Sequence, residues 1–193
     1  MTTQNEEILS WLRCAEEYLE AFLTLLKCSL ANNRDRCTRP TVLNFGYFLE
    51  NLLKAGIIRK NNLEESEIFG HVSAKLLTEA GLTDLTKSES DIIEFLSETV
   101  KWGKYPKRGK GDSGEMLRSS SDDHLLVFAD QTVFFTNLNN LKDLLKFSLR
   151  LFENIKSIVT SDLAESDEIY FSDTFDRLSF LLLTSLRSLE QGK

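Results

Sequence analysis

Two residues of the chain have the types and spacing needed for acid–base chemistry on a phosphodiester. Arg118 and His124 are separated by the five residues Ser-Ser-Ser-Asp-Asp. A histidine exchanges a proton near neutral pH, and an arginine stabilises negative charge that develops on a phosphate. Such a pair can cleave RNA without a metal ion, because the ribose 2′-hydroxyl supplies the nucleophile. The same segment also resembles a helix start, in which Ser121 or Asp122 caps the helix and His124 occupies its first turn. The sequence leaves both interpretations open.

A second candidate site is the segment KWGKYPKRGK, residues 101–110, which places five positive charges and two aromatic rings within ten residues. Lysine and arginine attract phosphate, and exposed aromatic faces stack on bases. The segment therefore predicts a contact with RNA or a nucleotide through Trp102, Lys104, Tyr105, Lys107 and Arg108. The alternative is that the two aromatic rings anchor the end of a helix while the lysines solvate a loop.

Other catalytic and cofactor sites lack support in the sequence. It contains no Gly-x-x-x-x-Gly-Lys-Ser/Thr loop, no Gly-x-Gly-x-x-Gly and no Gly-x-Ser-x-Gly. The only histidines are His71 and His124, and neither has a His or Cys partner at metal-ligand spacing. We therefore expect no metal and no cofactor, and we interpret His71 as a packed or hydrogen-bonded structural histidine.

The composition indicates what kind of protein must position these residues. A chain of 193 residues predicts one domain, 1–193, and the scarcity of glycine (9) and proline (2) favours long helices over a turn-rich β-fold. The net charge of −7 disfavours a protein that coats nucleic acid over its whole surface. The three cysteines, the acidic N-terminal residues and the lack of a long apolar run predict a cytoplasmic protein without membrane contact.

Apolar residues recur every three or four positions along most of the chain, which predicts an all-α, up-and-down bundle of four to six helices. Thr86 and Glu89 have capping-box spacing, and Gly81 suits a helix C-terminus. HLLVFADQTVFF, residues 124–135, also fits a short hairpin, so the start of the fifth helix stays open. The helices are expected at 5–31, about 38–58, about 66–80, about 86–103, about 121–159 and from about 173, with an exposed basic loop at about 104–121 and an acidic loop at about 160–172.

Three segments in a fixed order carry a family resemblance. LENLLKAGI (49–57), GHVSAKLLTEAGL (70–82) and TKSESDIIEFLSETVKWGKYP (86–106) together resemble the HEPN superfamily (higher eukaryotes and prokaryotes nucleotide-binding domain). The resemblance implies a helical bundle that commonly forms a homodimer. Many HEPN proteins are metal-independent RNases of defence or toxin–antitoxin systems, with an Arg-x4-6-His motif in the dimer cleft. Arg118 and His124 match that motif here.

The sequence thus predicts a HEPN-like protein that contacts RNA or a nucleotide. Whether it also cleaves RNA through Arg118 and His124 stays open. The alternative function is a non-catalytic interaction or scaffold module that binds a cognate protein partner in a defence or toxin–antitoxin system.

Overall fold

The structure is a computed structural model that describes residues 1–32, 38–63, 68, 70–104, 128–129, 132–133, 138–161 and 163–191. The described residues are almost entirely helical, which confirms the predicted all-α class. The helices are α1 (Thr3–Asn32), α2 (Thr38–Asn61), α3 (Ala74–Glu79), α4 (Lys87–Lys104), α5 (Leu138–Thr160) and α6 (Glu165–Glu190), with two short strands, β1 (Phe128–Ala129) and β2 (Thr132–Val133).

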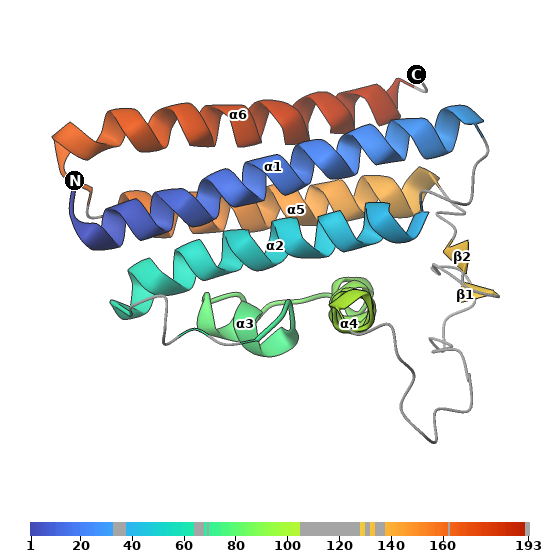
Figure 1. The fold of residues 1–193 in the computed structure, drawn as a ribbon, viewed down its shortest axis with the longest axis horizontal. Coiled ribbons are helices and arrows are strands. Elements are labelled where there is room, and N and C mark those ends of the chain that lie inside the picture. The colour runs from blue at the N-terminus through green and yellow to red at the C-terminus, as the bar shows by residue number, and fades with distance from the viewer. Residues whose placement is uncertain are drawn as a thin grey trace.

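Four long helices form the body of the molecule. In Figure 1, α1, α2, α5 and α6 lie along the long axis, and α1 contacts both α2 and α6 while α5 also contacts both. The helices α1 and α2 run in opposite directions, as do α5 and α6. The shorter α3 and α4 lie together against α2 on the side away from α6, and α4 runs across the direction of the long helices.

The core follows from the apolar spacing of the helices. The apolar residues that recur every three or four positions along α1 are buried, namely Ile8, Leu12, Ala15, Leu19, Phe22 and Leu26. Aromatic rings fill the space between helices: the Phe22 and Phe45 centroids lie 4.8 Å apart, and those of Phe152 and Phe175 lie 5.9 Å apart. Tilted and edge-on ring pairs at these distances are favourable packing arrangements.

The third helix is shorter than predicted, because it begins at Ala74 and not near residue 66. Ser73 has an extended backbone, with φ −163° and ψ 164°, and its hydroxyl accepts a hydrogen bond from the amide of Leu76. This N-cap geometry starts the helix only after Ser73. The predicted end is confirmed, since Gly81 follows the cap residue with φ +93°, a conformation that glycine adopts without steric cost.

The capping box at the start of α4 is confirmed. The Thr86 amide donates to Glu89 Oε2 at 2.8 Å, and the Glu89 amide donates to Thr86 Oγ1 at 3.3 Å. The two side chains thus satisfy amides that have no partner inside the helix.

The fifth helix begins later than the prediction of about residue 121, and residues 128–129 and 132–133 are paired strands, in agreement with the hairpin alternative. Strands β1 and β2 pair antiparallel, with Phe128 opposite Val133 and Ala129 opposite Thr132. Aromatic and β-branched residues favour strand over helix at these positions. The helix α5 then begins at Leu138.

The last helix begins at Glu165, so the prediction of an acidic loop is wrong for residues 165–172. Its first turn carries Glu165, Asp167 and Glu168, and carboxylates are favourable at the positive end of the helix dipole. Asp167 is also buried, where its Oδ2 accepts a hydrogen bond of 2.6 Å from Asn5 Nδ2. A polar segment that looks solvated in the sequence is therefore helical and anchored to α1.

Candidate functional site

The residues predicted to contact or cleave RNA fall at the edge of the described structure or outside it. Trp102 and Lys104 belong to the last turn of α4. Tyr105, Lys107 and Arg108 lie outside the described residues, as does the predicted basic loop beyond Lys104. Arg118 and His124 also lie outside the described residues. These predictions therefore stay predictions.

The structure does show how the start of the basic segment is attached to the body. Ile93, Leu96 and Val100 are buried residues of α4, which packs on α2. At Gly46 of α2 a Cβ atom would collide with Val100 Cγ2. The absence of a side chain at Gly46 thus lets α4 approach α2 closely at the residue that immediately precedes Lys101.

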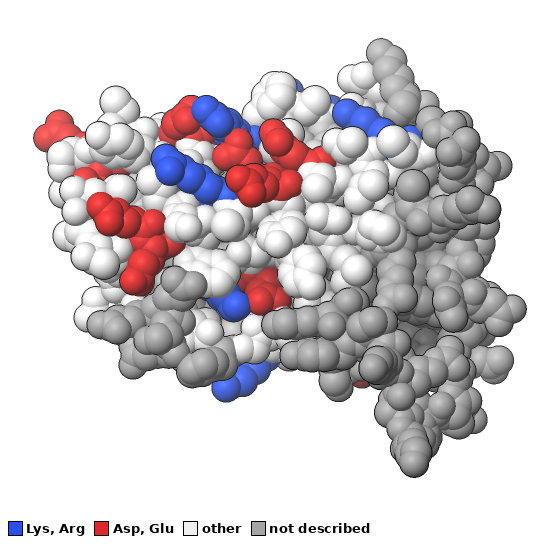
Figure 2. Space-filling view, viewed as in Figure 1, with Lys and Arg blue, Asp and Glu red and all other residues white. Residues whose placement is uncertain are grey.

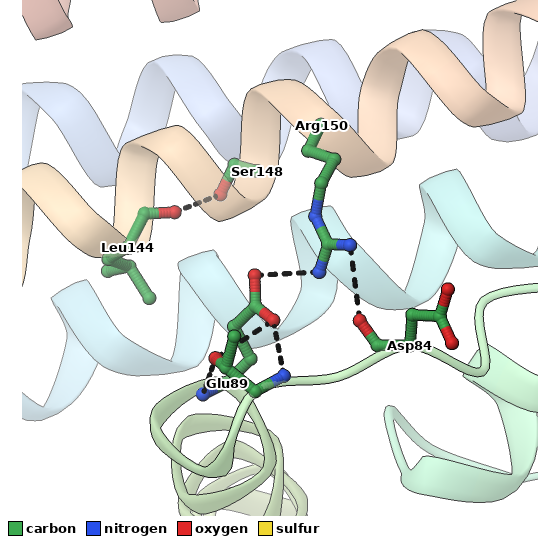
Figure 3. A network of polar contacts seen from close by, with 6 residues as sticks. Asp84, Glu89, Leu144, Ser148 and Arg150 are labelled. Carbon is green, nitrogen blue, oxygen red and sulfur yellow. Dashed lines mark hydrogen bonds and ion pairs between the residues drawn. The ribbon is translucent and has the colours of Figure 1, made fainter.

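The other end of α4 is fixed by Arg150 of α5 (Figure 3). Arg150 Nη2 donates to Glu89 Oε1 at 2.7 Å, and Nη1 donates to the carbonyl of Asp84 at 3.2 Å. Partial burial raises the pKa of Glu89, but the hydrogen bonds from Thr86 and Arg150 outweigh it, so the pKa lies below its ordinary value of 4.5. The helix that leads into the basic segment is therefore held at both ends.

A cluster of three polar side chains, which we call the Glu50 cluster, lies between α2 and the turn before α3. Glu50 and Lys54 are only 7% and 8% exposed. Lys54 Nζ lies 2.8 Å from Glu50 Oε1, and His71 Nδ1 lies 3.1 Å from Glu50 Oε2. Lys54 Nζ also lies 4.7 Å from the ring centroid of Trp11 on α1, a cation–π distance. Both oxygens of the buried carboxylate thus have partners.

The Glu50 carboxylate also affects Tyr47, one turn earlier on α2. Burial raises the pKa of the Tyr47 phenol, and the nearby Tyr18 and Glu50 raise it further. The rings of Tyr18 and Tyr47 have centroids 5.1 Å apart. The phenol therefore stays neutral over the physiological range beside the Glu50 cluster.

His71 is the member of the cluster whose chemistry is open to a ligand. An ionised carboxylate only accepts hydrogen bonds, so in the neutral ring Nδ1 carries the hydrogen and Nε2 presents a lone pair. The His71 side chain is 28% exposed. Among the described residues none forms a hydrogen bond with Nε2. The arrangement is that of a carboxylate-oriented imidazole, which accepts a proton or a hydrogen bond from a bound group.

The sequence analysis interprets His71 as a packed or hydrogen-bonded histidine but does not identify Glu50 as its partner. Glu50 and Lys54 are a charged pair four residues apart, within a stretch in which Leu49, Leu52 and Leu53 are all buried. A charged pair at helical spacing inside an apolar stretch is the signal that identifies such a site. Glu50 and His71 also come from two of the three segments that carry the HEPN resemblance.

The described surface offers other features besides this cluster. Figure 2 shows acidic and basic side chains side by side on the described part of one face. Ile169, Tyr170 and Phe180 of α6 are large apolar residues exposed to solvent. Across the described ranges no group of three His, Cys, Asp or Glu residues is placed to hold a metal ion. None of the helices, as far as their residues are described, has the length and apolarity to cross a membrane.

The chain matches no protein-family model, no curated protein and no solved structure.

Proposed function

We propose that this chain is a HEPN-like, cytoplasmic protein that acts as a homodimer and contacts RNA or a nucleotide through Trp102, Lys104, Tyr105, Lys107 and Arg108. The observation that supports the proposal is how the helix that precedes most of the basic segment is attached to the body of the protein. Its first residues, Lys101 to Lys104, form the last turn of a helix that is held at both ends, by Val100 against α2 and by Glu89 against Arg150. The backbone of Lys101 and Lys104 is already ordered in this helix, so binding of phosphate at these two residues costs less conformational entropy than it would on a free chain.

The positive charge of the basic segment is opposed by the net negative charge of the whole chain. Five positive charges stand within residues 101–110 of a chain whose net charge is −7. Salt screens the repulsion from distant carboxylates within about 10 Å at 0.1 M. We therefore expect binding to depend on direct phosphate contacts at the segment and to weaken as salt rises.

The test is the fluorescence anisotropy of a labelled single-stranded RNA at two salt concentrations. Removing three phosphate-binding charges in Lys104→Ala/Lys107→Ala/Arg108→Ala is expected to weaken binding at least tenfold at low salt and to flatten the salt dependence. The matched control is Lys27→Ala/Lys75→Ala/Lys146→Ala, which removes three exposed lysines from other helices and changes the net charge equally. Equal weakening in both variants contradicts a specific basic site.

Cleavage is a separate question for the same protein. If Arg118 and His124 act on the bound RNA, wild-type protein cleaves it in EDTA and His124→Ala does not. If folded wild-type protein binds the RNA but does not cleave it, the binding function stands and the catalytic function is contradicted.

The second candidate function is a non-catalytic protein-interaction module that binds a cognate partner. The observation in its favour is the outer face of α6, where Ile169 and Phe180 are 71% and 67% exposed. They are three helical turns apart and so lie on the same side of the helix. If the chain binds no RNA, we propose that a partner protein binds this surface.

A further inference from the structure

The outer face of α6 carries large apolar side chains that are exposed to solvent. Among the described residues, the exposed large apolar side chains are Met1, Ile169, Tyr170 and Phe180, and three of these four belong to α6. The helix contacts α1 and α5 and lies at the edge of the bundle (Figure 1). Apolar side chains that gather on one outward face are typical of a surface that binds another protein.

Two oppositely charged residues lie between these apolar side chains. The side chains of Asp173 and Arg177 are 64% and 61% exposed, and Arg177 Nη2 lies 2.9 Å from Asp173 Oδ2. Arg177 Nη1 also lies 3.6 Å from Glu16 Oε1 on α1. Ion pairs this exposed contribute little to the stability of a single copy, so both charges are able to meet a partner. Along the chain, the outer face of α6 therefore presents an apolar residue, an acid, a base and a second apolar residue.

This order of side chains is complementary to itself when a second copy of α6 runs in the opposite direction. The pair Ile169 and Phe180 and the pair Asp173 and Arg177 are both centred next to Phe175, so one two-fold axis serves both pairs. About that axis Ile169 lies opposite the partner's Phe180, and Asp173 lies opposite the partner's Arg177. Two-fold interfaces between identical chains repeat each such contact twice. In a parallel arrangement Asp173 would instead face the partner's Asp173, and like charges repel.

We propose that two copies of this chain associate through α6, packed antiparallel about a two-fold axis next to Phe175. The two contacts between Asp173 and Arg177 lie nearest the axis, and a contact between Ile169 and Phe180 flanks them on each side. The inference rests on the homodimer of the proposed function and names its surface. The exposed side chains of α6 supply this surface, because the HEPN resemblance implies a dimer without assigning α6 to it.

The test is sedimentation equilibrium of charge-reversed variants, alone and mixed, beside wild-type protein, which is expected to be a dimer. Asp173→Arg sets positive charges opposite each other across the axis, and Arg177→Asp sets negative charges opposite each other. Each variant alone is therefore expected to dimerise at least tenfold more weakly than wild type. In an equimolar mixture of the two variants, the positive charges of one copy face the negative charges of the other. The mixture is expected to recover dimers of about the wild-type affinity.

The matched control reverses an exposed pair on α5, where Lys146 Nζ lies 4.0 Å from Asp143 Oδ1. Asp143→Arg and Lys146→Asp make the same changes of charge on another helix and are expected to leave the dimer as it is in wild type. A further variant removes the apolar contacts. Ile169→Ser/Phe180→Ser is expected to weaken dimerisation at least tenfold while the chain stays folded, because both side chains are exposed in a single copy.

The outcomes separate this inference from the function on which it rests. A wild-type dimer that persists unchanged in the α6 variants, or a mixture of the two charge-reversed variants that stays monomeric, overturns the inference and leaves the homodimer to another surface. Wild-type protein that stays monomeric overturns the inference and the homodimer together. RNA binding is measured separately by anisotropy, so its failure overturns the RNA contact and not the α6 surface.

Discussion

Glu50 is a carboxylate inside the protein, and its two partners explain why it is tolerated there. A buried charge is costly unless it is paired and hydrogen-bonded. Lys54 and His71 each contact a different oxygen of Glu50, at 2.8 and 3.1 Å. The cluster joins α2 to the turn before α3, so it also fixes the position of His71.

Glu89 is a second residue with a defined role, because it makes the free energy of unfolding fall as the pH falls. Its pKa is lowered in the folded protein from the ordinary value of 4.5. The ionised form is therefore stabilised by folding above that value, and this contribution is lost as the pH falls through the folded-state pKa. We expect Glu89→Gln to be less stable than wild type at neutral pH.

The difference in the free energy of unfolding between wild type and Glu89→Gln should shrink as the pH falls below 4.5. Urea unfolding at neutral pH and at a series of acidic values measures it. The control is Glu79→Gln, because the partly exposed Glu79 carboxylate lies 3.5 Å from Lys75 Nζ within α3. A difference between wild type and Glu89→Gln that is constant with pH contradicts the assignment.

The position of α4 depends on how closely it packs against α2. Alanine at Gly46 gains about 1 kcal/mol of helix propensity. Its Cβ would collide with Val100 Cγ2, and valine has little rotamer freedom with which to withdraw that methyl group. Overpacking in a full core costs about 1–3 kcal/mol, so steric overlap outweighs propensity.

We therefore expect Gly46→Ala to lower the free energy of unfolding by about 1 kcal/mol, measured by urea unfolding. The double variant Gly46→Ala/Val100→Ala removes the opposing methyl groups. The double variant should lose less free energy of unfolding than the sum of the losses in the two single variants. Strict additivity of the two changes argues against the close contact.

At the scale of the whole molecule, a buried polar contact joins the first helix to the last. Asn5 Nδ2 donates to Asp167 Oδ2 at 2.6 Å across 162 residues of sequence. Arg59 Nη2 of α2 donates to Asn5 Oδ1 at 2.5 Å. One amide thus connects α1, α2 and α6.

We expect Asn5→Ala to lower the free energy of unfolding by about 2 kcal/mol, because it removes hydrogen bonds from the buried Asp167 and from Arg59. The midpoint of urea unfolding measures the loss. Gln4→Ala is the control, since Gln4 lies in the same turn and its Nε2 donates to Asn62 Oδ1 at 3.0 Å in an exposed contact and to the Ile58 carbonyl at 3.5 Å in a partly buried one. Equal effects of the two substitutions would show that the buried contact adds nothing.

Features that depend on neighbouring residues could be predicted from the sequence. Apolar spacing sets α1 and α2, and the Thr86–Glu89 capping box sets the start of α4, because helical periodicity and caps operate within one or two turns. The basic segment is likewise evident from composition alone, as is the spacing of Arg118 and His124.

Contacts between residues distant in the chain could not be predicted, because they depend on how the helices pack. The sequence predicts an acidic loop over residues 165–172. In the structure these residues are helical, and Asp167 accepts a buried hydrogen bond from Asn5. Glu50 and His71 are 21 residues apart, and nothing local to either residue indicates that they meet. Their meeting depends on how α3 packs against α2, because the free energy of burying a charge is set by its surroundings and not by its neighbours in sequence.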